Sequence, residues 1–159
     1  MTAEAIRAHP DETGGMLLGW DNPNRNEIVV ATIIGPGPGA RHRPTSFASD
    51  GIWQQTQLDA IYRHTDGRIT YLGDWHVHPN GGFGMSRRDR KTMAAIAGDP
   101  GARCPAPLMA LLAPGAKDRY HFGVWTWHST KVLFSYGVAV ALIVRGWEPT
   151  PADAFWIDL

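Results

Sequence analysis

The segment GDWHVHPNGGFGMSRRD, residues 73–89, constrains the fold of this chain more than any other stretch of its sequence. His76 and His78 are one residue apart, and on a β-strand two such side chains project from the same face. Pro79 follows at once and ends the strand, because it lacks the backbone donor that a strand interior requires. The glycines beyond it allow a sharp reversal of the chain. The segment therefore predicts a strand that carries two imidazoles to its end, followed by a tight loop.

A helix is predicted over residues 86–98, immediately after this loop. Ser86 and Asp89 have the spacing of a capping box, in which each side chain accepts a hydrogen bond from the other residue's backbone. Asp89 would then lie in the first turn of the helix, where its carboxylate can join His76 and His78. Two imidazoles and one carboxylate suit Zn²⁺ and leave a fourth position for water. Each part also has an ordinary structural interpretation, because closely spaced histidines occur by chance and capping boxes serve many helices.

The rest of the sequence predicts one α/β domain over residues 1–159, built on a mixed sheet with helices packed against it. Apolar and β-branched runs alternate with segments of helical period. Residues 35–44, GPGPGARHRP, are expected to form a loop, because proline and glycine prevent a regular strand there. We expect helices over 2–9, 49–65 and 86–98, and strands over 13–20, 27–35, 68–78, 107–115, 119–128 and 131–144.

The composition is that of a globular protein, with 43% hydrophobic and 19% charged residues. The formal net charge of +0 offers no electrostatic attraction for nucleic acid or an anionic membrane. The single cysteine, Cys104, excludes an internal disulfide and a thiolate-rich zinc site, and it suits a reducing compartment. The longest apolar run, residues 137–144, is shorter than the ~20 residues of a spanning helix, and the first residues lack the apolar core of a signal peptide. We therefore expect a soluble, cytoplasmic protein.

The segment HVHPNGGFGMSRRD resembles the His-x-His-Pro-x6-Ser-x2-Asp signature of the JAMM (MPN-plus) zinc metalloproteases, with every specified position present. Members of that family also have a glutamate upstream, and DETGGMLLG, residues 11–19, resembles its surroundings with Glu12 at the matching position. The resemblance extends over residues 4–115 and weakens beyond them. It implies the deaminase-like MPN fold, a curved mixed β-sheet flanked by helices, in a bacterial stand-alone JAB-type member.

The resemblance also implies a role for each matching residue. His76, His78 and Asp89 resemble the zinc ligands. Glu12 resembles the carboxylate that takes a proton from zinc-activated water and passes it to the leaving amine. Ser86 resembles the hydroxyl that helps to hold the oxyanion. Without the resemblance, Glu12 would be interpreted as an ordinary exposed carboxylate.

The implied activity is that of a zinc-dependent peptidase or isopeptidase acting after the C-terminal glycine tail of a ubiquitin-like protein, in deconjugation or precursor processing. E1-like and E2-like proteins are the implied partners. Processing of a sulfur-carrier protein and a non-catalytic MPN scaffold remain as alternatives. A zinc deaminase is excluded, because its Pro-Cys-x-x-Cys motif needs a second cysteine. Residues 41–50 resemble a segment found in bacterial members of the family, and a border of the substrate groove and a plain surface loop are equal alternatives for it.

Overall fold

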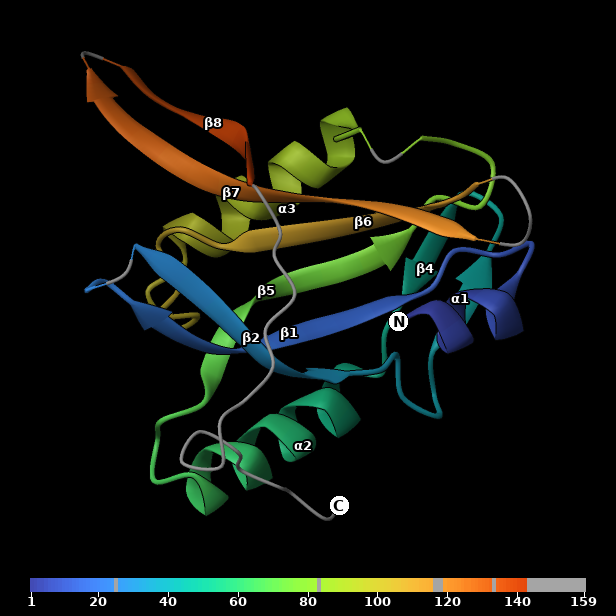
Figure 1. Cartoon of the computed structure of the whole chain (residues 1–159), viewed down its shortest axis with the longest axis horizontal. Coiled ribbons are helices and arrows are strands. Elements are labelled where there is room, and N and C mark those ends of the chain that lie inside the picture. Colours follow the sequence, from blue (N-terminus) through green and yellow to red (C-terminus); the bar gives the residue numbers. More distant parts are fainter. Residues whose placement is uncertain (25, 83, 116–118, 133, 143–159) are drawn as a thin grey trace.

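The computed structural model of the chain describes residues 1–24, 26–82, 84–115, 119–132 and 134–142, with side chains as far as residue 128. Within these ranges the chain forms helices on a twisted sheet (Figure 1). The elements are α1 (Thr2–Ala8), β1 (Gly14–Asn22), β2 (Glu27–Ile34), β3 (Arg41–Arg43), β4 (Ser46–Ala48), α2 (Gly51–His64), β5 (Thr70–Val77), α3 (Arg87–Gly98), β6 (Leu108–Pro114), β7 (Tyr120–Val132) and β8 (Phe134–Leu142).

The main sheet is mixed, with the described strands in the order β2-β1-β5-β6-β7-β8. β1 pairs with β2 as an antiparallel hairpin and pairs on its other side with β5, also antiparallel. β5 and β6 are parallel, and the α3 crossover connects them. The remaining neighbours, β6 with β7 and β7 with β8, are antiparallel. This arrangement confirms the α/β prediction and places β5, which carries both histidines, inside the sheet.

The prediction of a loop over residues 35–44 was wrong at its C-terminal end. Arg41–Arg43 pairs with Ser46–Ala48 as a separate two-stranded sheet, whereas residues 35–40 are irregular as expected. Strands of three residues are too short to show an alternation of apolar and polar side chains, so the sequence carries no signal for them.

The sheet has a different apolar cluster on each face. Trp75 and Val77 of β5 pack with Ala5 of α1 on one face, and Met109 of β6 packs with Met93 of α3 on the other. A third cluster joins α2 to the β1–β2 end of the sheet through Leu18, Ile34, Ile61 and Ile69. None of the described helices has the length and apolar character needed to cross a membrane. His76 lies on the α3 face, because it alternates with Trp75 along β5.

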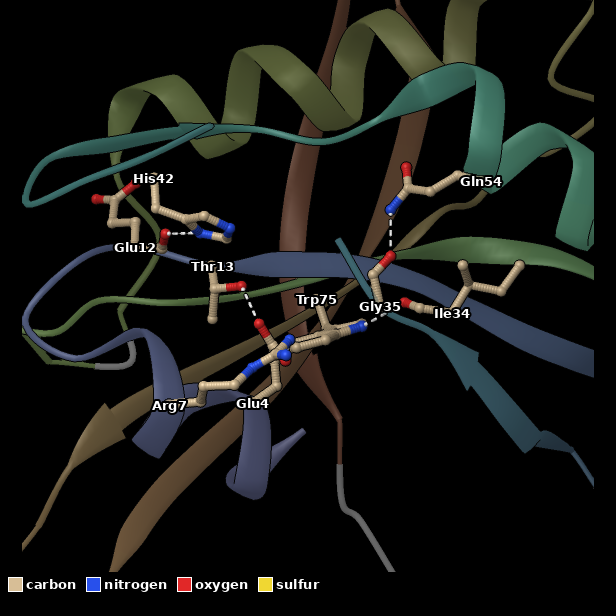
Figure 2. Close-up of polar contacts among 9 residues, drawn as sticks. All are labelled: Glu4, Arg7, Glu12, Thr13, Ile34, Gly35, His42, Gln54 and Trp75. Atoms are coloured by element: carbon tan, nitrogen blue, oxygen red, sulfur yellow. Dashed lines mark hydrogen bonds and ion pairs between the residues drawn. The ribbon is translucent and has the colours of Figure 1, made fainter. Parts of the chain in front are cut away.

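Two glycines allow unusually close backbone contacts around β5. A Cβ on Gly15 would lie 1.9 Å from the Ile34 carbonyl oxygen and 2.8 Å from Trp75 Nε1. The bare backbone lets the Trp75 indole donate a hydrogen bond to that carbonyl at 3.2 Å (Figure 2). Gly73 has φ +143°, and a Cβ there would lie 2.1 Å from the Leu108 carbonyl oxygen in the neighbouring strand.

Candidate metal centre and active site

Three predicted ligands converge where β5 ends and α3 begins. His76 Nε2 and His78 Nε2 lie 2.9 Å apart. Asp89 Oδ1 lies 3.3 Å from His76 Nε2, and Asp89 Oδ2 lies 3.5 Å from His78 Nε2. His76 and Asp89 are buried, and His78 is half-buried. The structure therefore directs two imidazole nitrogens and one carboxylate toward a common point.

The Asp89 Oδ1–His76 Nε2 distance of 3.3 Å matches a tetrahedral metal site, and the His76–His78 separation of 2.9 Å is shorter than such a site requires. With metal–ligand bonds of about 2.0–2.1 Å, donor atoms at the corners of a tetrahedron lie about 3.3–3.4 Å apart. His78 Nδ1 lies 2.9 Å from the Gly82 carbonyl oxygen, which can only accept a hydrogen bond. The proton of the neutral ring is therefore on Nδ1, and the lone pair of Nε2 points toward His76. An outer hydrogen bond of this kind fixes the tautomer of a metal-ligating histidine.

The capping box of α3 is present as predicted, and it fixes the Asp89 carboxylate. The Ser86 N–H donates to Asp89 Oδ2 at 2.7 Å, and the Asp89 N–H donates to Ser86 Oγ at 3.1 Å. Burial alone would raise the pKa of Asp89, but the neighbouring His76 and His78 imidazoles and the hydrogen bond from the Ser86 backbone hold it well below its ordinary value. Asp89 is thus an anion whose Oδ2 is engaged by the helix cap, which leaves Oδ1 for a metal.

Glu12 reaches the same place from the other end of the chain. In the antiparallel β1–β5 pair, Gly14 lies opposite His76, and the Val77 N–H donates to the Thr13 carbonyl at 2.9 Å. Continuing the register by two residues brings Glu12 level with His78, with both side chains on the face that carries His76. Burial raises the pKa of Glu12, and the neighbouring histidines oppose this shift. A carboxyl group with a raised pKa is suited to proton transfer near neutral pH.

A cavity of about 360 Å³ lies beside the cluster, and Glu12, His76 and Asp89 are in its wall. Among the described residues, His78 and Ser86 are not part of that wall, and Ser86 is exposed as the N-cap of α3. Its hydroxyl oxygen accepts the Asp89 N–H, so its own hydrogen stays available to donate. The structure therefore brings Ser86 next to a ligand without placing it in the cavity.

The cavity wall also includes Phe47 and Ala48 of the segment 41–50, for which a border of the substrate groove was one expectation. It further includes residues that the sequence did not single out: Gln54, Arg88, Thr92 and Met109. Thr92 lies three residues after Asp89 on α3, so the helical period relative to Asp89 was a usable signal for Thr92. Gln54 is 3% exposed, and its side chain donates to the Gly35 carbonyl at 2.7 Å. Nothing in the local sequence marks Gln54, because its burial depends on how α2 packs.

Comparison with known proteins agrees with this geometry. The family model for prokaryotic homologues of the JAB domain matches residues 1–156. A probable metalloprotease, y4qB of Sinorhizobium fredii, is 39% identical over 120 residues, which cover 74% of this chain and 72% of that protein. The solution structure of protein DSY2949 from Desulfitobacterium hafniense has a TM-score of 0.55 at 21% identity, covering 79% of this chain and 76% of that one. The similarity to DSY2949 shows a shared fold.

Proteins named CD-NTase/cGAS isopeptidase are also similar. The one from Enterobacter hormaechei is 28% identical over 121 residues, covering 76% of this chain and 65% of that protein. The one from Escherichia coli is 30% identical over 109 residues, covering 67% of this chain and 64% of that protein. The chain thus spans slightly less than two thirds of the length of these two relatives.

Fold, ligand cluster and relatives together define a JAMM-type metallopeptidase with the MPN fold. Within that class, the chain belongs to the family of prokaryotic homologues of the JAB domain.

Proposed function

We propose that residues 1–159 form a single zinc-dependent peptidase or isopeptidase domain that cleaves the amide bond after the C-terminal glycine tail of a ubiquitin-like protein. One observation carries the proposal: the donor atoms of His76, His78 and Asp89 converge beside a cavity that Glu12 also lines. A scaffold that only binds a partner has no need to keep both a ligand set and a half-buried carboxylate. Zinc is proposed because the donors are two imidazoles and one carboxylate that face one another.

His76, His78 and Asp89 would hold the ion. When bound, Zn²⁺ supplies Lewis acidity that polarises the scissile carbonyl and lowers the pKa of water at the site. Glu12, as a carboxylate, takes a proton from the attacking water and delivers it to the leaving amine, a task worth about 10²–10⁴ in rate. The Ser86 hydroxyl donates to the oxygen of the scissile carbonyl as negative charge develops on it. Atoms balance, because the water is divided between the new carboxylate and the new amine.

The proposed substrate follows from the shape of the site and from the relatives. β4 borders the cavity through Phe47 and Ala48, and an extended peptide can lie along such a strand with few side-chain contacts. Glycines at the end of a tail suit this approach, because they add no bulk. The relatives named isopeptidase support a protein conjugate as substrate, with E1-like and E2-like proteins as the proposed partners. The single Cys104 supports a reducing cytoplasm as the compartment.

The test begins with the zinc content of the purified protein and its turnover of a peptide that ends in Gly-Gly with an amide-linked fluorophore. We expect about one zinc per chain and zinc-dependent release of the fluorophore. Glu12→Gln should retain zinc and lose about 10²–10⁴-fold in kcat, because the amide cannot accept the proton. His76→Ala is the matched control that should lose zinc as well as activity.

Unchanged turnover by Glu12→Gln would remove Glu12 from the mechanism. Full activity of metal-free protein would refute the metal role. Cleavage only when the tail belongs to a sulfur-carrier protein would select the processing alternative. Stable binding of a conjugate without cleavage, by protein that is fully loaded with zinc, would select the scaffold.

A further inference from the structure

The β3–β4 hairpin borders the cavity and also contacts the backbone of Glu12. Phe47 and Ala48 of β4 line the cavity. The other strand of the hairpin, β3, contacts the segment before β1. That segment carries Glu12, which lies two residues before Gly14, the first residue of β1. The β1–β5 ladder therefore does not include the Glu12 backbone, and another element has to hold it.

The hairpin binds both polar backbone groups of Glu12. The Glu12 N–H donates to the Arg43 carbonyl oxygen at 2.8 Å. His42 Nδ1 lies 2.9 Å from the Glu12 carbonyl oxygen, as Figure 2 shows. Because a carbonyl oxygen only accepts, His42 must carry its proton on Nδ1 to make this bond. Successive residues of β3 thus hold the backbone of the proposed base, one through its carbonyl and one through its imidazole.

Phe47 keeps the His42 ring in place. The two rings are stacked, with centroids 6.3 Å apart and planes at 17°. The Phe47 ring also packs on Gly14, where an added Cβ would lie 2.7 Å from ring atoms. Gly14 pairs with His76, so the contacts run from the strand that carries the ligands, through Phe47 and His42, to the Glu12 carbonyl. This chain of contacts fixes the imidazole in one orientation.

We infer that His42 is a positioning residue that aims the Glu12 carboxylate by holding its backbone. The inference rests on the proposed function, in which Glu12 is the base. A base must lie within hydrogen-bond reach of the proton that it takes, and a displacement of about 1 Å costs roughly 10²-fold in rate. Loss of the His42 hydrogen bond releases one side of the Glu12 peptide and leaves the three metal ligands in place. Slower turnover with intact metal binding is the expected signature.

Two substitutions separate the hydrogen bond from the ring stack. His42→Phe keeps an aromatic ring beside Phe47 and removes the donor, whereas His42→Asn keeps an N–H donor and removes the ring. With the Gly-Gly fluorogenic peptide, His42→Phe should lower kcat by about 10–100-fold at unchanged KM and zinc content. His42→Asn should recover most of the lost rate. His64→Ala, at the exposed end of α2, is the control that should change none of these quantities.

Wild-type kcat in His42→Phe would overturn the inference. A loss of zinc in that variant, or a loss of rate in His42→Asn as large as in His42→Phe, would assign His42 a purely structural role and overturn it as well.

The imidazole tautomer gives a readout that does not depend on turnover. At a pH where His42 is neutral, two-bond ¹H–¹⁵N correlations, assigned by comparison with His42→Asn, should show the proton on Nδ1. A proton on Nε2 would eliminate the hydrogen bond and the inference with it. If zinc-loaded wild-type protein shows the Nδ1–H form and still cleaves no amide, the hydrolase proposal fails while the backbone clamp remains.

Discussion

Substitutions of Ser86 should separate three properties of the site: helix stability, metal binding and turnover. The Ser86 hydroxyl oxygen accepts the Asp89 N–H, whereas the Asp89 carboxylate is held by the backbone N–H of residue 86. Any residue except proline keeps that backbone donor. Asp89 should therefore stay in place, and zinc should stay bound, when the hydroxyl is removed.

The expected magnitudes differ between alanine and asparagine. Ser86→Ala removes the cap acceptor, which should cost ~1 kcal/mol, within the usual range of about 0.5–2 kcal/mol. For a domain of this size, that lowers Tm by about 2–4 °C. Ser86→Asn caps a helix about as well as serine, so its stability should match that of the wild type. Ser86→Ala lacks the hydroxyl that we propose for the oxyanion, so it should lose about 10²–10³-fold in kcat, and Ser86→Thr, which keeps a hydroxyl, should recover activity.

The assay combines urea unfolding in excess zinc, zinc content after gel filtration, and kcat on the Gly-Gly fluorogenic peptide. Excess zinc keeps the contribution of metal binding to stability equal in all variants. Wild-type kcat in Ser86→Ala would show that the hydroxyl takes no part in the reaction. A drop in zinc content in either variant would show that Asp89 is not held independently of the hydroxyl.

Two further predictions concern the sheet that carries the ligands. Gly73→Ala should destabilise the fold by about 2–6 kcal/mol in urea unfolding, because residue 73 has a φ of +143° and an added Cβ would clash with the β6 backbone. The control Gly98→Ala, where an added Cβ meets nothing within 4 Å, should be neutral or slightly stabilising. A cost below ~1 kcal/mol for Gly73→Ala would contradict this geometry. Trp75→Phe should cost about 1–3 kcal/mol in the same assay, because it removes the donor to the buried Ile34 carbonyl, and equal stability would show that this hydrogen bond is dispensable.

The parts of the fold that were predictable from the sequence depend on neighbours along the chain. The strand before Pro79 and the helix that begins after Ser86 follow from local rules, and the structure has both. The His76, His78 and Asp89 side chains converge because fourteen residues of strand, loop and helix contain all three.

The parts that were not predictable depend on pairing between distant segments. Glu12 lies 64 residues before His76, and only the β1–β5 register brings the two together. The family resemblance pointed to Glu12, whereas residue chemistry alone did not distinguish it from any other carboxylate. His42 had no local signal at all, because its importance depends on a three-residue strand folding back onto the segment before β1.

The two halves of the centre have different requirements during folding. The three proposed metal donors belong to one short segment, because β5, the loop after it and the first turn of α3 contain all of them. The proposed proton acceptor, Glu12, comes into place only when β1 docks antiparallel to β5 in the correct register. A slip of one residue in that docking would turn Glu12 to the opposite face of the sheet and bring Thr13 in its place. A copy in which β1 has not docked would therefore hold the three proposed ligands without the proposed base.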